Sequence, residues 1–97
     1  MRQHKILVVD DEEGVRAVVR ARLVREGYAV LEAADGAAAL ELAAAQNPDL
    51  VITDIVMPGL GGREFVQRLR ARSPVPVIFL TGRAEDVEVV VGLTLGA

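Results

Sequence analysis

The chain has 97 residues, enough for one domain, and its 52% hydrophobic and 26% charged content is ordinary for a globular protein. A formal net charge of -3 and a pI of about 5.1 exclude a general basic surface for nucleic acid. The absence of cysteine excludes disulfides and thiolate sites, so a reducing cytoplasm is the expected compartment. No run approaches the roughly 20 apolar residues of a membrane span, and apolar residues 6–9 are too few for a signal peptide.

Residues 5–9 are the first predicted strand, a nearly unbroken apolar run that ends at Asp10 and Asp11. A helix is predicted next, because apolar residues recur at helical spacing on one face while arginines occupy much of the rest. The apolar positions are Val15, Val18, Val19 and Leu23, and the arginines are Arg16, Arg20, Arg22 and Arg25. Gly27 is expected to cap this helix. The helix macrodipole explains acids at 11–13, but not two acids at the tip of a buried strand.

Residues 28–32 are predicted as the second strand. Asp35 is expected to be the N-cap of an alanine-rich helix over 37–45, which Asn47 and Pro48 end. The alanines favour close packing on a sheet.

Residues 50–53 are apolar or β-branched and lead directly to Asp54, as expected for a strand buried on both faces of a parallel sheet. Open α/β sheets bind ligands at the carboxyl ends of their strands, so Asp54 is well placed for chemistry, although one aspartate there can equally serve a turn. The glycines of loop 57–62 match neither the dinucleotide nor the Walker A pattern, and turn geometry is expected to explain them. Phe65, Val66 and Leu69 mark the buried face of a third helix.

Residues 77–80 are a fourth apolar strand, which ends at Thr81. A last helix is predicted over about 85–95, although valines 89–91 and Gly92 form helices poorly and a strand is the alternative. The alternation of strands and helices predicts an α/β fold of right-handed βαβ units on a parallel sheet.

Polar side chains therefore meet at one predicted sheet edge: Asp10 and Asp11, Asp54, and Thr81. Carboxylates this close repel one another, and an all-oxygen cluster with few protein ligands suits Mg²⁺. A carboxylate beside Mg²⁺ can attack phosphorus as a nucleophile, with Thr81 donating a hydrogen bond to a phosphoryl oxygen. The single histidine, His4, is expected to be an exposed bystander.

Together these motifs resemble the receiver domain of two-component response regulators, over nearly the whole chain. The motifs that carry the resemblance are, in order, Val8-Val9-Asp10-Asp11-Glu12, Ile52-Thr53-Asp54-Ile55-Val56-Met57-Pro58-Gly59 and Phe79-Leu80-Thr81-Gly82. The resemblance implies a flavodoxin-like, doubly wound sheet with strand order 2-1-3-4-5.

The resemblance also implies roles for individual residues. Asp54 would accept a phosphoryl group from the phosphohistidine of a sensor histidine kinase. Asp11 and Asp54 would bind Mg²⁺ through their carboxylates, with the carbonyl of Val56 as a third ligand and Asp10 acting largely through water. Thr81 would be the switch hydroxyl, and the first helix would supply much of the kinase docking face.

The family pattern continues beyond Ala97 with a fifth strand, a lysine at its tip and a fifth helix, which have no counterpart here. Residues 1–97 are therefore expected to be a receiver domain incomplete at its C-terminus, with sheet order 2-1-3-4. Residues 77–80 would then be an unpaired apolar edge. We expect either a fragment or a chain that completes itself by dimerisation or strand exchange.

Two other interpretations stay open. A phosphatase-like α/β enzyme would use Asp10 as its nucleophile, but it gives the Asp54 motif no role. A receiver-shaped binding module would use its acids only as helix caps and would bind no Mg²⁺. The residue that carries the phosphoryl group, and the affinity for Mg²⁺, distinguish these from a phosphoacceptor.

Overall fold

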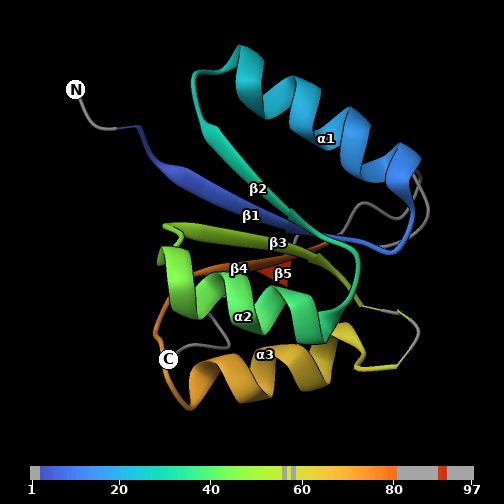
Figure 1. Ribbon diagram of the computed structural model, residues 1–97, viewed down its shortest axis with the longest axis vertical. Helices are drawn as coiled ribbons and strands as arrows, with labels where there is room; N and C mark the ends of the chain where they lie inside the picture. The colour runs from blue at the N-terminus through green and yellow to red at the C-terminus, as the bar shows by residue number, and fades with distance from the viewer. Residues whose placement is uncertain (1–2, 56, 58, 81–89, 92–97) are drawn as a thin grey trace.

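The computed structural model describes residues 3–55, 57, 59–80, 90 and 91 (Figure 1). Within these residues the chain forms a five-stranded sheet in the order β2-β1-β3-β4-β5. The first four strands pair in parallel, which confirms the predicted flavodoxin-like order 2-1-3-4. The strands are β1 (Lys5–Val9), β2 (Ala29–Ala33), β3 (Leu50–Asp54), β4 (Val77–Leu80) and β5 (Val90–Val91).

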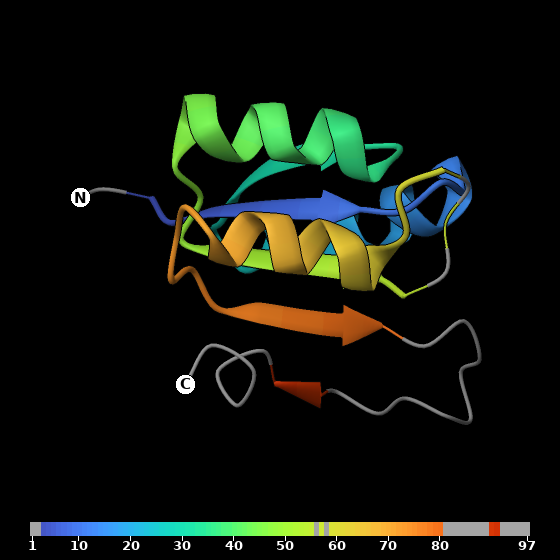
Figure 2. The ribbon, with the colours of Figure 1, turned by 90° about the horizontal axis from the view of Figure 1, so that it is seen from below.

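Helices cover both faces of the sheet. Helix α1 (Glu13–Arg25) lies on one face, and α2 (Gly36–Gln46) and α3 (Gly62–Arg70) lie on the other (Figures 1 and 2). Side chains of a strand point alternately to opposite faces, so β1 contributes Leu7 and Val9 to the larger core under α2 and α3, and Ile6 and Val8 to the smaller core under α1. None of the helices described here is long and apolar enough to cross a membrane.

The two predicted helix caps are confirmed. The Asp35 carboxylate accepts a hydrogen bond from the Ala38 amide at 2.8 Å, at the start of α2. Gly27 follows the end of α1 with φ +92°, a backbone conformation that glycine adopts without steric cost. Phe65, Val66 and Leu69 are buried on α3, also as predicted.

The prediction for the buried face of α1 was wrong at one position. Val18 is 71% exposed, whereas Val19 and Leu23 pack against the small core. The half-buried face instead includes Arg16, which the sequence pattern placed among the outward arginines. Position 16 lies one turn before 19 on the same side of the helix, and Val18 lies about 100° away from Val19. Polar partners on the sheet decide that an arginine faces inward there.

The prediction for the last segment is also corrected. The predicted helix over 85–95 does not hold at residues 90 and 91, which form β5, antiparallel to β4. Residues 85–89 and 92–95 lie outside the described residues. Ile78 pairs with Val91 and Phe79 with Val90, so the edge of β4 is not wholly unpaired. β-branched valines favour this extended pairing over a helix.

Candidate functional site

The carboxyl ends of β1 and β3 bring three aspartates together. The neighbouring strands are in register at Val9 and Thr53, so Asp10 and Asp54 come next at the same edge of the sheet. Asp10 is 4% exposed, Asp54 is half-buried and Asp11 is exposed. One carboxylate oxygen from each aspartate lies within 4.8 Å of those of the other two. The predicted convergence of these three side chains is therefore present.

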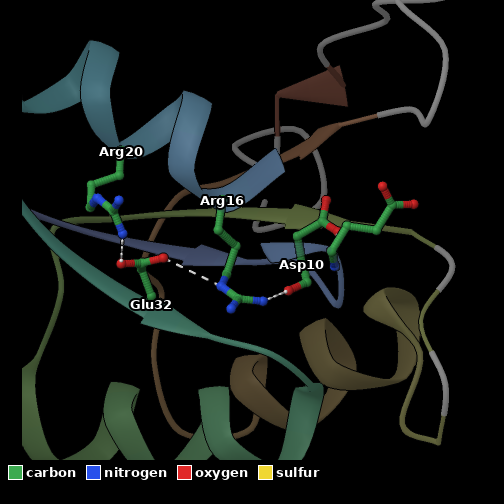
Figure 3. A network of polar contacts seen from close by, with 5 residues as sticks. Asp10, Arg16, Arg20 and Glu32 are labelled. Carbon is green, nitrogen blue, oxygen red and sulfur yellow. Dashed lines mark hydrogen bonds and ion pairs between the residues drawn. The ribbon is translucent and has the colours of Figure 1, made fainter. Parts of the chain in front are cut away.

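Asp10 is fixed through three groups of its own. Its amide donates to the Ala33 carbonyl at 3.1 Å, which ties it to the end of β2. Its Oδ1 accepts a hydrogen bond from the Glu12 amide at 2.9 Å, and its backbone carbonyl accepts one from Arg16 Nη1 at 2.6 Å (Figure 3). The two backbone bonds hold the main chain at Asp10, and the bond from Glu12 holds one oxygen of its buried carboxylate.

Asp54 is held mainly by its own loop. Its Oδ1 accepts a hydrogen bond from the Ile55 amide at 2.8 Å, and its carbonyl accepts one from the Thr53 hydroxyl at 3.0 Å. Among the described residues, Oδ2 receives no hydrogen bond. The Gly62 amide donates to the Ile55 carbonyl at 2.9 Å, so the first turn of α3 is bonded to the segment that follows Asp54.

Burial and neighbouring charges both change the pKa of Asp10. Burial raises the pKa of Asp10 above its ordinary value, the Glu12 amide opposes that rise, and the charges of Asp54, Asp11 and Glu12 add to it. Two carboxylates roughly 4–5 Å apart repel by roughly 3–4 kcal/mol at the effective dielectric typical near a protein surface. A cation that offsets this repulsion would stabilise the site.

The donor set fits a hard divalent cation. Every candidate ligand atom is a carboxylate oxygen, and the exposed Asp11 leaves one side of the cluster open to water. Mg²⁺ takes one or two carboxylates, keeps several waters and shares its shell with phosphate oxygens. Asp10, Asp11 and Asp54 could hold such an ion.

Two predicted site residues, Val56 and Thr81, lie outside the described residues. His4 lies near the start of β1, at the opposite end of that strand from Asp10. Its side chain is 69% exposed and within 3.5 Å of Asp49, in agreement with its expected absence from the site.

Sequence reasoning missed two residues beside the site. Arg16 and Glu32 form a polar link from β2 to the carbonyl of Asp10 (Figure 3). The available signal was Glu32 itself, an acid in an otherwise apolar strand, beside a helix with arginines at 16 and 20. Strand periodicity does not identify the partner of such an acid, because the partner lies on another element.

The fold and the site define a class of protein: a doubly wound α/β domain with an acidic cluster at the carboxyl edge of its central strands. The family model of the response regulator receiver domain matches residues 6–97. The chain belongs to this family, and it is a signalling module of response regulators.

Similar transcriptional regulatory proteins agree with the assignment. The transcriptional regulatory protein AfsQ1 of Streptomyces coelicolor is 39% identical over 92 residues, which cover 95% of this chain and 41% of the relative. The alkaline phosphatase synthesis transcriptional regulatory protein PhoP of Bacillus subtilis is 43% identical over 94 residues, which cover 96% of this chain and 39% of the relative. The chain thus spans about two fifths of the length of these relatives.

Solved structures agree as well. The chemotaxis protein CheY4 of Vibrio cholerae superposes with a TM-score of 0.81 at 37% identity, covering 86% of this chain and 72% of that one. The N-terminal domain of a response regulator receiver protein from Methanoculleus marisnigri has a TM-score of 0.80 at 35% identity, covering 84% of this chain and 69% of that one.

Proposed function

We propose that this receiver accepts a phosphoryl group on Asp54 in an Mg²⁺-dependent reaction and responds with a changed surface. The observation that carries the proposal is the convergence of Asp54 with Asp10 and Asp11, one oxygen from each within 4.8 Å. An isolated aspartate at a strand end has no such neighbours. The carboxylates of Asp10 and Asp11, beside the half-buried Asp54, provide a place for the metal next to the attacking oxygen.

In the proposed transfer, a carboxylate oxygen of Asp54 attacks the phosphorus of a phosphohistidine. A P–O bond forms and the P–N bond breaks, and the electron pair stays on the imidazole nitrogen of the donor. No general base is needed, because an ionised carboxylate has no proton to lose. The carboxylates of Asp11 and Asp54 and the carbonyl of Val56 would hold Mg²⁺, with Asp10 acting largely through water. The bound ion would offset negative charge on the transferring group.

Exposure favours Asp54 over Asp10 as the nucleophile. Asp10 is 4% exposed, and the Glu12 amide occupies one of its oxygens. The Ile55 amide likewise occupies one oxygen of Asp54, but Asp54 is half-buried, so exposure is what distinguishes the two. An incoming phosphodonor therefore meets Asp54 more readily, which weighs against the phosphatase-like interpretation.

The output and the partner belong to the same proposal. Thr81 would move toward the phosphoryl group, so that phosphorylation alters the surface of the domain. The donor would be a sensor histidine kinase, and this chain would act in the cytoplasm. Helix α1 would supply much of the docking face, because it exposes Val18 and Val24 beside Arg20 and Arg22.

The test is phosphorylation by acetyl phosphate with Mg²⁺, followed by intact mass and by borohydride reduction of the aspartyl phosphate. We expect one phosphoryl group, located on Asp54 and lost in Asp54→Asn. A label on Asp10 would establish the phosphatase-like alternative. An unlabelled protein that also fails to bind Mg²⁺ would leave only a receiver-shaped binding module.

A further inference from the structure

Glu32 of β2 joins two arginines of α1. Its Oε2 accepts a hydrogen bond from Arg20 Nη1 at 2.6 Å, and its Oε1 accepts one from Arg16 Nε at 3.3 Å (Figure 3). The side chain of Arg16 is only 16% exposed, compared with 47% for Arg20. Arg16 is therefore the inner member of this network and Arg20 is the outer one.

Arg16 also reaches the candidate metal site. Its Nη1 donates to the backbone carbonyl of Asp10 at 2.6 Å, while its Nε faces Glu32. A guanidinium is planar and presents its donors in a fixed fork, so one group can hold two acceptors in a set relative orientation. Glu32 thus sets the direction from which Arg16 meets the site.

The hydrogen bond from Arg16 to the Asp10 carbonyl affects both Asp10 and Asp11, the acids that follow β1. The carbonyl of Asp10 and the amide of Asp11 belong to one planar peptide group. A donor fixed on that carbonyl limits rotation of the plane from which both side chains extend. Arg16 touches the backbone of Asp10 and not its carboxylate, so the candidate metal ligands stay available.

We propose that Arg16, held by Glu32, is a positioning residue that orients the Asp10-Asp11 peptide so that both carboxylates converge with Asp54 on Mg²⁺. This inference rests on the proposed function. Positioning and simple charge predict opposite signs for the loss of Arg16. A nearby positive charge repels Mg²⁺, so its removal alone would strengthen binding, whereas loss of orientation weakens it.

The experiment is an Mg²⁺ titration of the ¹⁵N-labelled chain, followed by its amide resonances, for wild type, Arg16→Gln and Glu32→Gln. We expect Arg16→Gln to raise the Kd for Mg²⁺ about 10-fold, the size seen when groups that orient metal ligands are removed. The matched control is Arg68→Gln, which removes an arginine paired with Glu64 on α3, away from the site, and should leave the Kd unchanged. Thermal unfolding without Mg²⁺ checks that each variant is folded.

Two further readouts separate positioning from a merely structural role. With acetyl phosphate as donor, Arg16→Gln should shift the half-saturating Mg²⁺ concentration by the same factor, while the rate at saturation stays within about twofold. The double variant Arg16→Gln/Glu32→Gln should bind no more weakly than Arg16→Gln, because Glu32 acts through Arg16.

Unchanged or tighter Mg²⁺ binding by folded Arg16→Gln would overturn the positioning role, and so would a defect confined to the rate at saturation. Folded Glu32→Gln provides the same test should Arg16→Gln not fold, since it leaves Arg16 present but without the charged carboxylate that holds it. A wild-type chain that binds no Mg²⁺ would overturn the proposed function and the positioning role together. If the wild type binds Mg²⁺ and both variants bind it with the same Kd, the positioning role alone is overturned.

Discussion

Gly62, at the start of α3, lies directly against the backbone of Asp54. A Cβ built on Gly62 would overlap the Asp54 carbonyl oxygen and stand 3.0 Å from both the Asp54 carbonyl carbon and the Ile55 Cα. The Gly62 amide meanwhile donates to the Ile55 carbonyl at 2.9 Å. The first turn of α3 and the end of β3 can approach this closely only because residue 62 has no side chain. Any displacement of that turn therefore displaces the proposed phosphoacceptor.

Gly62→Ala is expected to lower the free energy of unfolding by about 2 kcal/mol, because the overlap with backbone atoms must be relieved by moving β3 or α3. It should also slow labelling by acetyl phosphate. The control is Gly14→Ala on α1, where an added Cβ meets no atom within 4 Å and should stabilise the helix by roughly 0.5–1 kcal/mol. Urea unfolding measures both, and equal effects of the two substitutions would contradict the close approach.

Asp10→Asn should stabilise the metal-free protein at neutral pH by about 1 kcal/mol, while abolishing tight Mg²⁺ binding. The folded state raises the pKa of Asp10, chiefly by burial. The stabilisation that protonated Asp10 contributes is thus fully present at pH values below its ordinary pKa of 3.8. It is lost as the pH rises through the raised pKa of the folded state.

The pH dependence of unfolding checks this sign. The advantage of Asp10→Asn over wild type should shrink in acid, where the wild-type carboxyl is protonated, and saturating Mg²⁺ should reverse it at neutral pH. A variant that is less stable than wild type at neutral pH without metal would show that the cost of burying the charged carboxylate is not the dominant effect at this position.

Glu32→Gln should destabilise the protein by about 1 kcal/mol at neutral pH. The hydrogen bond from Arg20, then the charge of Arg20 and the contact with Arg16, lower the pKa of Glu32. The stabilisation that ionised Glu32 contributes is therefore fully present at pH values above its ordinary pKa of 4.5. It is lost as the pH falls through the lowered pKa of the folded state. Partial exposure of the pair with Arg20 keeps the effect small.

Chemical unfolding of Glu32→Gln at neutral pH and in acid would measure that loss. Glu64→Gln serves as the comparison, since Glu64 pairs with Arg68 at 3.5 Å on an exposed face and should cost almost nothing. An effect of Glu32→Gln that persists unchanged in strong acid would rule out the ion pairs as its cause.

Asp35→Ala should cost about 1 kcal/mol of stability, because the Ala38 amide at the start of α2 loses its acceptor. Asp35→Asn keeps a side-chain oxygen in place and should cost only a few tenths of that. Thermal unfolding of the two variants side by side gives the comparison, and an equal loss in both would point to charge instead of the hydrogen bond.

Residues that follow local rules could be placed from the sequence. The apolar runs of β1, β3 and β4, the cap at Asp35 and the turn at Gly27 each depend on a few neighbouring residues, and all are present as predicted. The cluster of Asp10, Asp11 and Asp54 was also predictable, because parallel strands in a doubly wound sheet end at one edge.

What the sequence determined by itself is where the parallel strands lie along the chain and which acids follow them, because strand burial and helix amphipathicity depend on local periodicity. The sheet order 2-1-3-4 was implied by the resemblance to receiver domains. Only the tertiary structure decided that Arg16 faces inward while Val18 faces solvent, that residues 90 and 91 pair with β4, and that Gly62 meets the Asp54 carbonyl. Each of these depends on a partner from a distant part of the chain. Contacts between distant parts of the chain are determined by how the elements pack, so they cannot be predicted from the pattern within a single element.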